Sequence, residues 1–247
     1  PINGNPPPTW AALATAWNPV SKQGLSIALA PWESLGAHGG SSPHTGFAAL
    51  DLDNDRDIDL VLTSDGSPPL AIVNDRLGMF HNQPLDDLQT VEPASGLLVT
   101  DLDQDGLPDV VLPAAAKSLQ ALRNTTTRTL AEKPRLGFEP FPTNAQGWRT
   151  AIAADLDLDG LPDLVGLPAS GSEKGSIAWA RNEGKRLASA ELPVALETPD
   201  VVGLALADVT GDPLPDLILA VNGKGPAVAR NLGNGHNWLS LQLGGHW

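Results

Sequence analysis

Four short acidic loops recur along this chain, and they constrain the fold more than any other feature. The best formed spans residues 155–163 and reads DLDLDGLPD, with carboxylates at positions one, three, five and nine. Related loops span residues 51–59, 101–109 and 208–216, and the first aspartates lie 50, 54 and 53 residues apart. A fixed period near 50 residues indicates a repeat architecture. We call these segments loops 1 to 4 in chain order.

Carboxylates at this density repel one another unless a positive charge lies among them. Oxygen ligands so close together suit a hard cation, and Ca²⁺ before Mg²⁺, because Ca²⁺ accepts many oxygens in loose geometry. A single loop of this kind could be a solvated turn, since aspartate favours turns. Four copies in register favour metal binding. An EF-hand is excluded, because position twelve holds no Glu and strands are expected around the loops.

Each loop lies between two apolar segments that predict a pair of strands, buried on both faces near a central axis. The third strands of the units end at Asn74, Asn124, Asn182 and Asn231. The fourth, weaker strands are expected near residues 78–81, 128–130, 186–188 and 238–243. Four short antiparallel strands per unit of about 50 residues describe a β-propeller blade. The predicted fold is therefore all-β, a β-propeller of four-stranded antiparallel blades.

These residues resemble the FG-GAP/VCBS repeat family, the calcium-loop propeller blades also found in integrin α-subunit heads. The resemblance covers most of residues 46–231, and residues 230–245 resemble the opening of an ASPIC/UnbV segment. It implies that positions one, three, five and nine of a loop supply side-chain oxygens, and that position seven supplies a backbone carbonyl. The implied ligands are Asp51, Asp53, Asp55, Asp57, Asp59, Asp101, Asp103, Asp105, Leu107, Asp109, Asp155, Asp157, Asp159, Leu161, Asp163, Asp208, Thr210, Asp212, Leu214 and Asp216.

The loops differ at position six, where a sharp turn favours glycine. Gly106 and Gly160 can take φ > 0 there. Loop 1 has Arg56 at this position, which we expect to point outward and offset part of the charge. Loop 4 has Thr210 at position three and Pro213 at position six, and proline cannot take φ > 0. We expect three to four bound Ca²⁺ ions, with loops 2 and 3 binding best, loop 1 next and loop 4 weakest.

Composition narrows the classes of partner. A net charge of −14 disfavours nucleic acid and anionic membranes, which need basic patches. No apolar run approaches the length of a transmembrane helix, so membrane insertion is not expected. The chain has no Cys, which removes disulfides, thiolate catalysis and cysteine-type zinc sites. Calcium-type loops favour a secreted, periplasmic or cell-surface location, although no signal peptide is visible in residues 1–8.

Three functions are compatible with this pattern. The first is a non-catalytic, calcium-stabilised interaction or scaffold module whose protein or glycan partner the sequence does not identify. The second is a glycan-binding, lectin-like propeller, for which the seven Trp residues could provide a platform. The third is a propeller lyase or hydrolase, disfavoured because the chain has no Tyr and no readable cluster of catalytic side chains. We expect the five His residues to lie in turns or on the surface, and Trp148, Trp179 and Trp238 to pack within blades.

The number of blades stays open. We divide the chain into an N-terminal linker and partial blade at residues 1–24 and propeller blades at residues 25–247, with a strand at 25–30. Two explanations account for the extra strand: a degenerate N-terminal blade from residues 9–30, or excision from a larger propeller. In the second case the chain is a fragment or subunit of a larger assembly.

Overall fold

The computed structural model describes residues 43–64, 67–75, 79–84, 94–115, 118–127, 136–169, 177–190, 192, 201–212 and 214–233. The predicted N-terminal segment 1–24, the strands at 25–30 and 238–243, and most of the C-terminal resemblance lie outside these residues. The described residues form strands, turns and bends without a helix, which agrees with the all-β prediction. Among them no helix is long and apolar enough to cross a membrane.

Four antiparallel sheets follow one another in chain order, and we call them blades 1 to 4. Blade 1 contains β1 (His44–Leu50), β2 (Asp59–Ser64), β3 (Ser67–Asn74) and β4 (Phe80–Pro84). Blade 2 contains β5 (Leu98–Thr100), β6 (Asp109–Leu112), β7 (Gln120–Asn124) and β8 (Phe138–Phe141). Blade 3 contains β9 (Trp148–Ala154), β10 (Asp163–Pro168), β11 (Ala178–Asn182) and β12 (Leu187–Ala190). Blade 4 has three described strands, β13 (Val201–Ala207), β14 (Asp216–Val221) and β15 (Gly225–Ala229).

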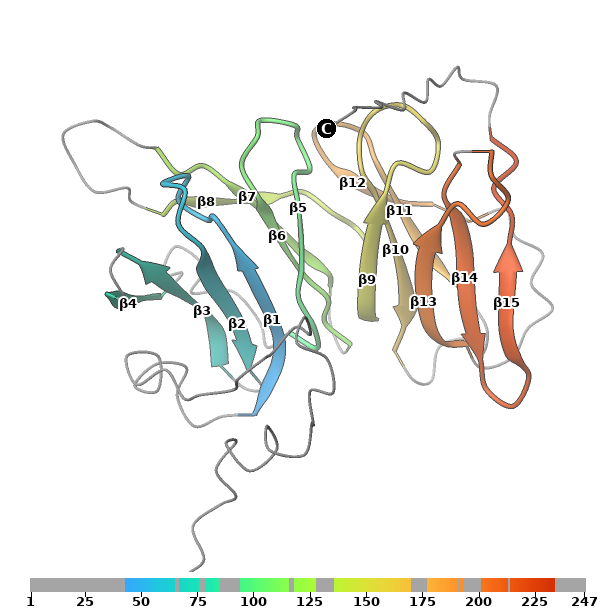
Figure 1. Ribbon diagram of the computed structural model, residues 1–247, viewed down its shortest axis with the longest axis horizontal. Coiled ribbons are helices and arrows are strands. Elements are labelled where there is room, and N and C mark those ends of the chain that lie inside the picture. The colour runs from blue at the N-terminus through green and yellow to red at the C-terminus, as the bar shows by residue number, and fades with distance from the viewer. Residues whose placement is uncertain are drawn as a thin grey trace, which may run out of the picture.

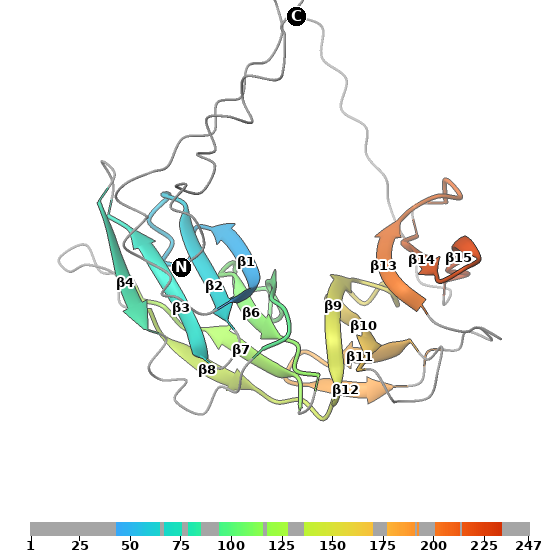
Figure 2. The same ribbon diagram turned by 90° about the horizontal axis from the view of Figure 1, so that it is seen from below.

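In every blade the strands pair in sequence order, as expected for propeller blades. Figure 2 shows the four sheets arranged along an arc, with blades 1 and 4 at its ends. Strand β5 contacts β9, and β13 contacts both β9 and β10, so the first strands of consecutive blades lie near one another. Figure 1 shows the connections between the first and second strands of the blades at the same edge of the array.

The hydrophobic core lies between consecutive blades. In β6, Val110 packs in a cluster shared with blade 1, whereas its neighbour Val111 packs in a cluster shared with blade 3. In β10, Leu164 and Val165 divide in the same way between blades 2 and 4. Successive side chains of a strand point to opposite faces, so a strand between two blades needs apolar residues on both. The continuous apolar run predicted for the second strands is therefore confirmed.

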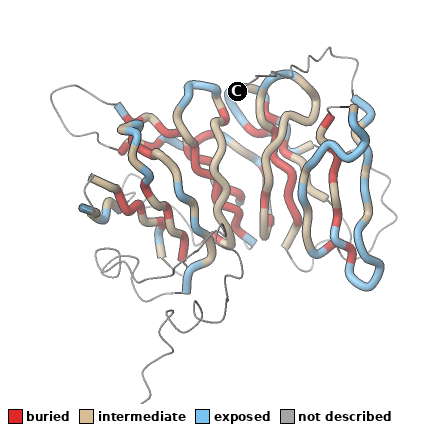
Figure 3. Tube along the Cα trace, viewed as in Figure 1, coloured by how far each residue is buried: buried red, intermediate tan, exposed pale blue. Residues whose placement is uncertain are grey.

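The first strands are less buried than predicted. Residues of β1 and β5 are half-buried or exposed, and β13 alternates between buried, half-buried and exposed positions. Figure 3 shows that buried residues are concentrated in the middle strands of the blades. A first strand is the edge of its sheet and has a neighbouring strand on one side only, so it loses less surface to solvent than the second strand does.

The predicted position of the fourth strand was wrong for blade 2. Residues 128–130 lie outside the described residues, and the fourth strand is β8, which begins at Phe138. Cross-strand register explains this position. In blades 1 to 3 the asparagine that ends the third strand is paired with a large apolar residue: Asn74 with Phe80, Asn124 with Phe138 and Asn182 with Leu187. In these three blades the fourth strand begins at the apolar residue that pairs with the asparagine, although the connecting loops differ in length.

The predicted packing role of Trp148 is confirmed. Its side chain is 2% exposed and packs in the core between blades 2 and 3. Gly166 on the neighbouring strand makes room for it, because a Cβ atom at this glycine would collide with the indole ring and with the carbonyl oxygen of Thr150. Trp179 is half-buried and packs against the core shared with blade 4. Two of the histidines, His44 and His81, are exposed or half-buried.

Candidate metal centres

The ninth position of each loop holds a buried aspartate that connects two parts of its blade. Asp109 is fully buried, and its Oδ2 accepts a hydrogen bond from the Leu102 backbone N–H at 2.7 Å. Its Oδ1 accepts one from the backbone N–H of Asn124, at the end of the third strand, also at 2.7 Å. Asp59 makes the equivalent pair of bonds at 2.8 Å each. This carboxylate therefore joins the start of its loop to the third strand.

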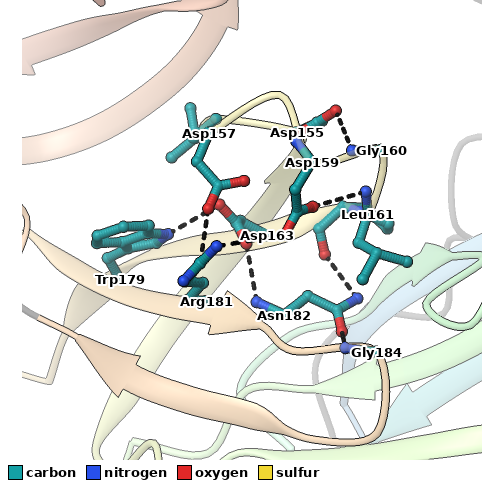
Figure 4. A network of polar contacts seen from close by, with 12 residues as sticks. Asp155, Asp157, Asp159, Gly160, Leu161, Asp163, Trp179, Arg181, Asn182 and Gly184 are labelled. Atoms are coloured by element: carbon teal, nitrogen blue, oxygen red, sulfur yellow. Dashed lines mark hydrogen bonds and ion pairs between the residues drawn. The ribbon is translucent and has the colours of Figure 1, made fainter. Parts of the chain in front are cut away.

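The other two blades repeat part or all of this arrangement. In blade 3, Asp163 accepts the Asn182 N–H at 2.8 Å and the Trp179 indole N–H at 3.1 Å, as Figure 4 shows. In blade 4, Asp216 accepts the N–H groups of Val209 at 3.2 Å and Asn231 at 2.8 Å. A carboxylate with both oxygens hydrogen-bonded is held in one orientation, which suits a fixed ligand.

The first and fifth aspartates shape the turn of each loop. In loop 3, Asp155 accepts the N–H groups of Asp159 at 3.1 Å and Gly160 at 2.9 Å. Asp159 in turn accepts the N–H of Leu161 at 3.0 Å. The same pattern occurs in loop 1, where Asp51 accepts the N–H groups of positions five and six at 2.9 Å each. Aspartate side chains that bond to nearby backbone N–H groups stabilise tight turns.

Backbone torsions confirm the turn predicted at position six and add a second one. Gly106 and Gly160 have φ of 87° and 94°, and Arg56 has φ of 76° at the equivalent position in loop 1. Position four is also left-handed in every loop, a feature that sequence reasoning missed. The residues there are Asn54, Gln104, Leu158 and Gly211. A left-handed Leu158 is unfavourable on its own, so the surrounding hydrogen bonds must stabilise this conformation.

The structure brings three groups of loop carboxylates together. Within each group one oxygen from every residue lies within 4.8 Å of the others. The groups are Asp51, Asp53 and Asp59; Asp101, Asp103 and Asp109; and Asp155, Asp157 and Asp159. In two groups a buried oxygen, Oδ1 of Asp53 or of Asp101, has no hydrogen-bond partner among the described residues. A buried acceptor without a donor is costly, and a hard cation bound among these oxygens would satisfy it.

Electrostatics agrees with this geometry. Burial raises the pKa of Asp53 to about 6, and repulsion from Asp59, Asp55 and Asp51 adds to the effect. Burial also raises the pKa of Asp109 and of Asp163 to about 6, although the hydrogen bonds that these carboxylates accept from backbone N–H groups lower their pKa. Carboxylates so close to one another and to the core favour a proton or a cation.

Arginine side chains reach three of the loops, which sequence reasoning did not predict. Each immediately precedes the asparagine that ends, or in blade 4 closely follows, the third strand of its own blade. Arg181 places Nε 2.6 Å from Asp157 Oδ2 and Nη2 3.4 Å from Asp159 Oδ2, as Figure 4 shows. Arg230 lies 2.8 Å from Asp212, and Arg123 lies 3.5 Å from Asp103. The signal was available, because arginine precedes asparagine in three of the four units.

Comparison with protein-family models agrees with the repeat. The model described as FG-GAP-like repeat matches residues 51–112, 101–166 and 155–219, which together cover well over half of the chain. The chain belongs to the FG-GAP-like repeat family. Each match begins at the first aspartate of a loop and ends within or at the end of the second strand of the next blade. No curated protein matches the chain.

The four loops differ in how many of their predicted ligands they bring together. Loops 1, 2 and 3 each bring three of their predicted aspartates together. Loop 4 has no such group of three acidic side chains among its described residues, and Thr210 there donates a hydrogen bond to Asp216 at 3.2 Å. At position seven, the N–H groups of Asp57, Leu107 and Leu161 donate to the aspartates at position five. The role predicted for the position-seven carbonyls stays a prediction.

Proposed function

We propose that this chain is a calcium-binding, non-catalytic propeller-type module that serves as a scaffold for interaction with another molecule. The observation that carries the calcium assignment is the combination of three aspartate groups with buried, unsatisfied oxygens at Asp53 and Asp101. The candidate ligands in these three groups are all aspartate carboxylate oxygens. This set suits Ca²⁺ better than zinc or copper, which favour nitrogen and sulfur.

Bound Ca²⁺ would stabilise the folded state of the blades. Positions one to nine connect the first strand to the second, and in every blade the residue before the loop pairs directly with the ninth position, as Leu50 pairs with Asp59. A cation among these carboxylates removes their mutual repulsion and holds the hairpin closed. Because the unfolded chain does not bring the ligands together, binding favours the folded state by mass action.

Thermal unfolding with Ca²⁺ and with chelator tests this proposal. At a Ca²⁺ concentration 100 times the Kd, each filled site stabilises the folded state by about 2.7 kcal/mol. That corresponds to a rise in Tm of about 5–10 °C per site in a chain of this size. The matched variant Asp101→Asn/Asp103→Asn should lose part of the rise, and Mg²⁺ should give a smaller one. An equal Tm in Ca²⁺ and in chelator would contradict calcium binding.

The interaction role is supported by family membership, since FG-GAP-like repeats suggest a propeller-like interaction module. We further propose an exported location, where Ca²⁺ is abundant enough to fill weak sites. Glycan and protein arrays probed in Ca²⁺ and in chelator would distinguish the two classes of partner. Binding to neither array, together with hydrolysis or elimination of a polysaccharide, would favour an enzyme instead.

A further inference from the structure

The asparagine that ends a third strand, or in blade 4 follows it two residues after the end of β15, connects its blade to the acidic loop of the blade before it. Asn124 donates from Nδ2 to the Leu52 carbonyl oxygen in loop 1 at 2.9 Å. Asn182 donates in the same way to Leu102 in loop 2 at 2.8 Å. Asn231 donates to Leu156 in loop 3 at 3.0 Å. Three consecutive junctions therefore use the same contact, between residues 72 to 80 positions apart.

The contacted carbonyl belongs to position two, between the candidate ligands at positions one and three. In loop 2 the Leu102 N–H is bonded to Asp109 of its own loop, and its carbonyl to Asn182 of the next blade. The Leu102 side chain is fully buried and packs with Trp148 and Leu164 of that next blade. The residue that separates two metal ligands is thus held by the neighbouring blade through both its backbone and its side chain.

The asparagine is itself held in one orientation. Its Oδ1 accepts the N–H of the residue two positions later: Thr126 for Asn124, Gly184 for Asn182 and Gly233 for Asn231, each at 2.9 Å. Its backbone N–H donates to the ninth aspartate of its own blade, as Figure 4 shows for Asn182 and Asp163. One asparagine therefore contacts two loops. It reaches the preceding loop through the amide and its own loop through the main chain, and the amides of Asn124 and Asn182 also donate to Pro108 and Pro162 of their own loops at 3.2 and 3.1 Å.

We propose that these asparagines are positioning residues that couple each metal loop to the following blade, so that a loop reaches full affinity for its cation only when the next blade is folded against it. The proposal rests on the proposed calcium function. Part of the cation affinity of a loop would then come from a residue on the following blade. If each loop were only a local turn, or each blade folded independently, no residue of another blade would affect that affinity.

Loop 3 allows a direct test, because Trp179 donates its indole N–H to Asp163 in that loop and can sensitise bound Tb³⁺, a luminescent substitute for Ca²⁺. The part of the signal lost in Asp157→Asn identifies loop 3. The test variant is Asn231→Ala, on blade 4. The matched control is Asn124→Ala, which removes the same contact from loop 1 and leaves the neighbours of loop 3 intact.

We expect Asn231→Ala to lower the affinity of loop 3 for Tb³⁺ and for competing Ca²⁺ by about three- to tenfold, which is the effect of one lost hydrogen bond. Asn124→Ala should leave loop 3 within twofold of wild type. Asn231→Asp, which keeps the acceptor but lacks the amide donor, should weaken loop 3 as the alanine variant does. Thermal melts and circular dichroism check that each variant is folded at the titration temperature.

Equal loop 3 affinities in Asn231→Ala and Asn124→Ala, with both variants folded, would overturn the coupling and leave calcium binding intact. If Asn231→Ala does not fold, Asn231→Asp provides the same comparison. A wild-type protein with no saturable Tb³⁺ signal that Ca²⁺ displaces would overturn both the coupling and the proposed function.

Discussion

Replacement of Asp109 by alanine tests whether the ninth aspartate joins its loop to its blade. The carboxylate is fully buried and accepts two backbone N–H groups at 2.7 Å each. Asp109→Ala leaves both donors buried without a partner, at a cost of about 1–3 kcal/mol each, or about 2–6 kcal/mol in total. The substitution also removes a carboxylate that is unfavourable when ionised.

The size of that compensation follows from the pKa. Burial raises the pKa of Asp109 from its ordinary value of 3.8 to about 6. The folded state therefore binds the proton more tightly than the unfolded state does, and stability falls as pH rises from about 4 to about 6. The loss is roughly 1–3 kcal/mol, where the lower figure allows for water near the loop. At pH 7 the net effect of Asp109→Ala should thus be about 1–3 kcal/mol, and at pH 4 it should approach the full 2–6 kcal/mol.

Urea unfolding in metal-free buffer at pH 4 and pH 7 measures both values. The control is Asp105→Ala in the same loop, which removes an exposed carboxylate and one hydrogen bond to the Leu107 N–H. Its effect should stay within about 0.5–1 kcal/mol at both pH values. A loss for Asp109→Ala below about 0.5 kcal/mol at pH 4, or a larger loss at pH 7 than at pH 4, would refute the reasoning.

Three further predictions concern the packing and charge of the loops. Gly166→Ala should destabilise the fold by about 1–3 kcal/mol or more in urea unfolding, because the added Cβ collides with Trp148. The control Gly203→Ala should be nearly neutral in the same assay, because the added Cβ would lie 3.6 Å from its nearest neighbour, the Cβ of Ala220. Arg181→Met should raise the Ca²⁺ affinity of loop 3 by about two- to fivefold in titration calorimetry, since the cation no longer competes with the guanidinium for Asp157, while metal-free stability changes by less than about 1 kcal/mol. The metal-free wild-type protein should lose stability between pH 4 and pH 6, because the pKa values of Asp53, Asp109 and Asp163 are raised to about 6. Excess Ca²⁺ should remove this loss. A metal-free stability that rises over the same interval would contradict the prediction.

The loops were predictable because their chemistry is local. Spacing alone indicated that aspartates gather in loops 1, 2 and 3, but not which three: they are positions one, three and nine in loops 1 and 2, and positions one, three and five in loop 3. Glycine at position six indicated a left-handed turn, which Gly106 and Gly160 adopt. The left-handed Leu158 was not predictable, since leucine disfavours that conformation and only the surrounding bonds impose it. The fourth strand of blade 2 was misplaced because it follows a longer connection than in blades 1 and 3, and its first residue, Phe138, is fixed by pairing with Asn124 on another strand.

The sequence by itself determined the repeat, the strand order within a blade and the positions of the candidate metal ligands, because these depend on residues within one unit of about 50. Only the tertiary structure decided which residue of the next blade each loop contacts. The Asn182 side chain and the Leu102 carbonyl are 80 residues apart, and no periodic pattern shows that they meet. The contact exists because the blades pack face to face through apolar second strands, which brings the end of one third strand to the neighbouring loop.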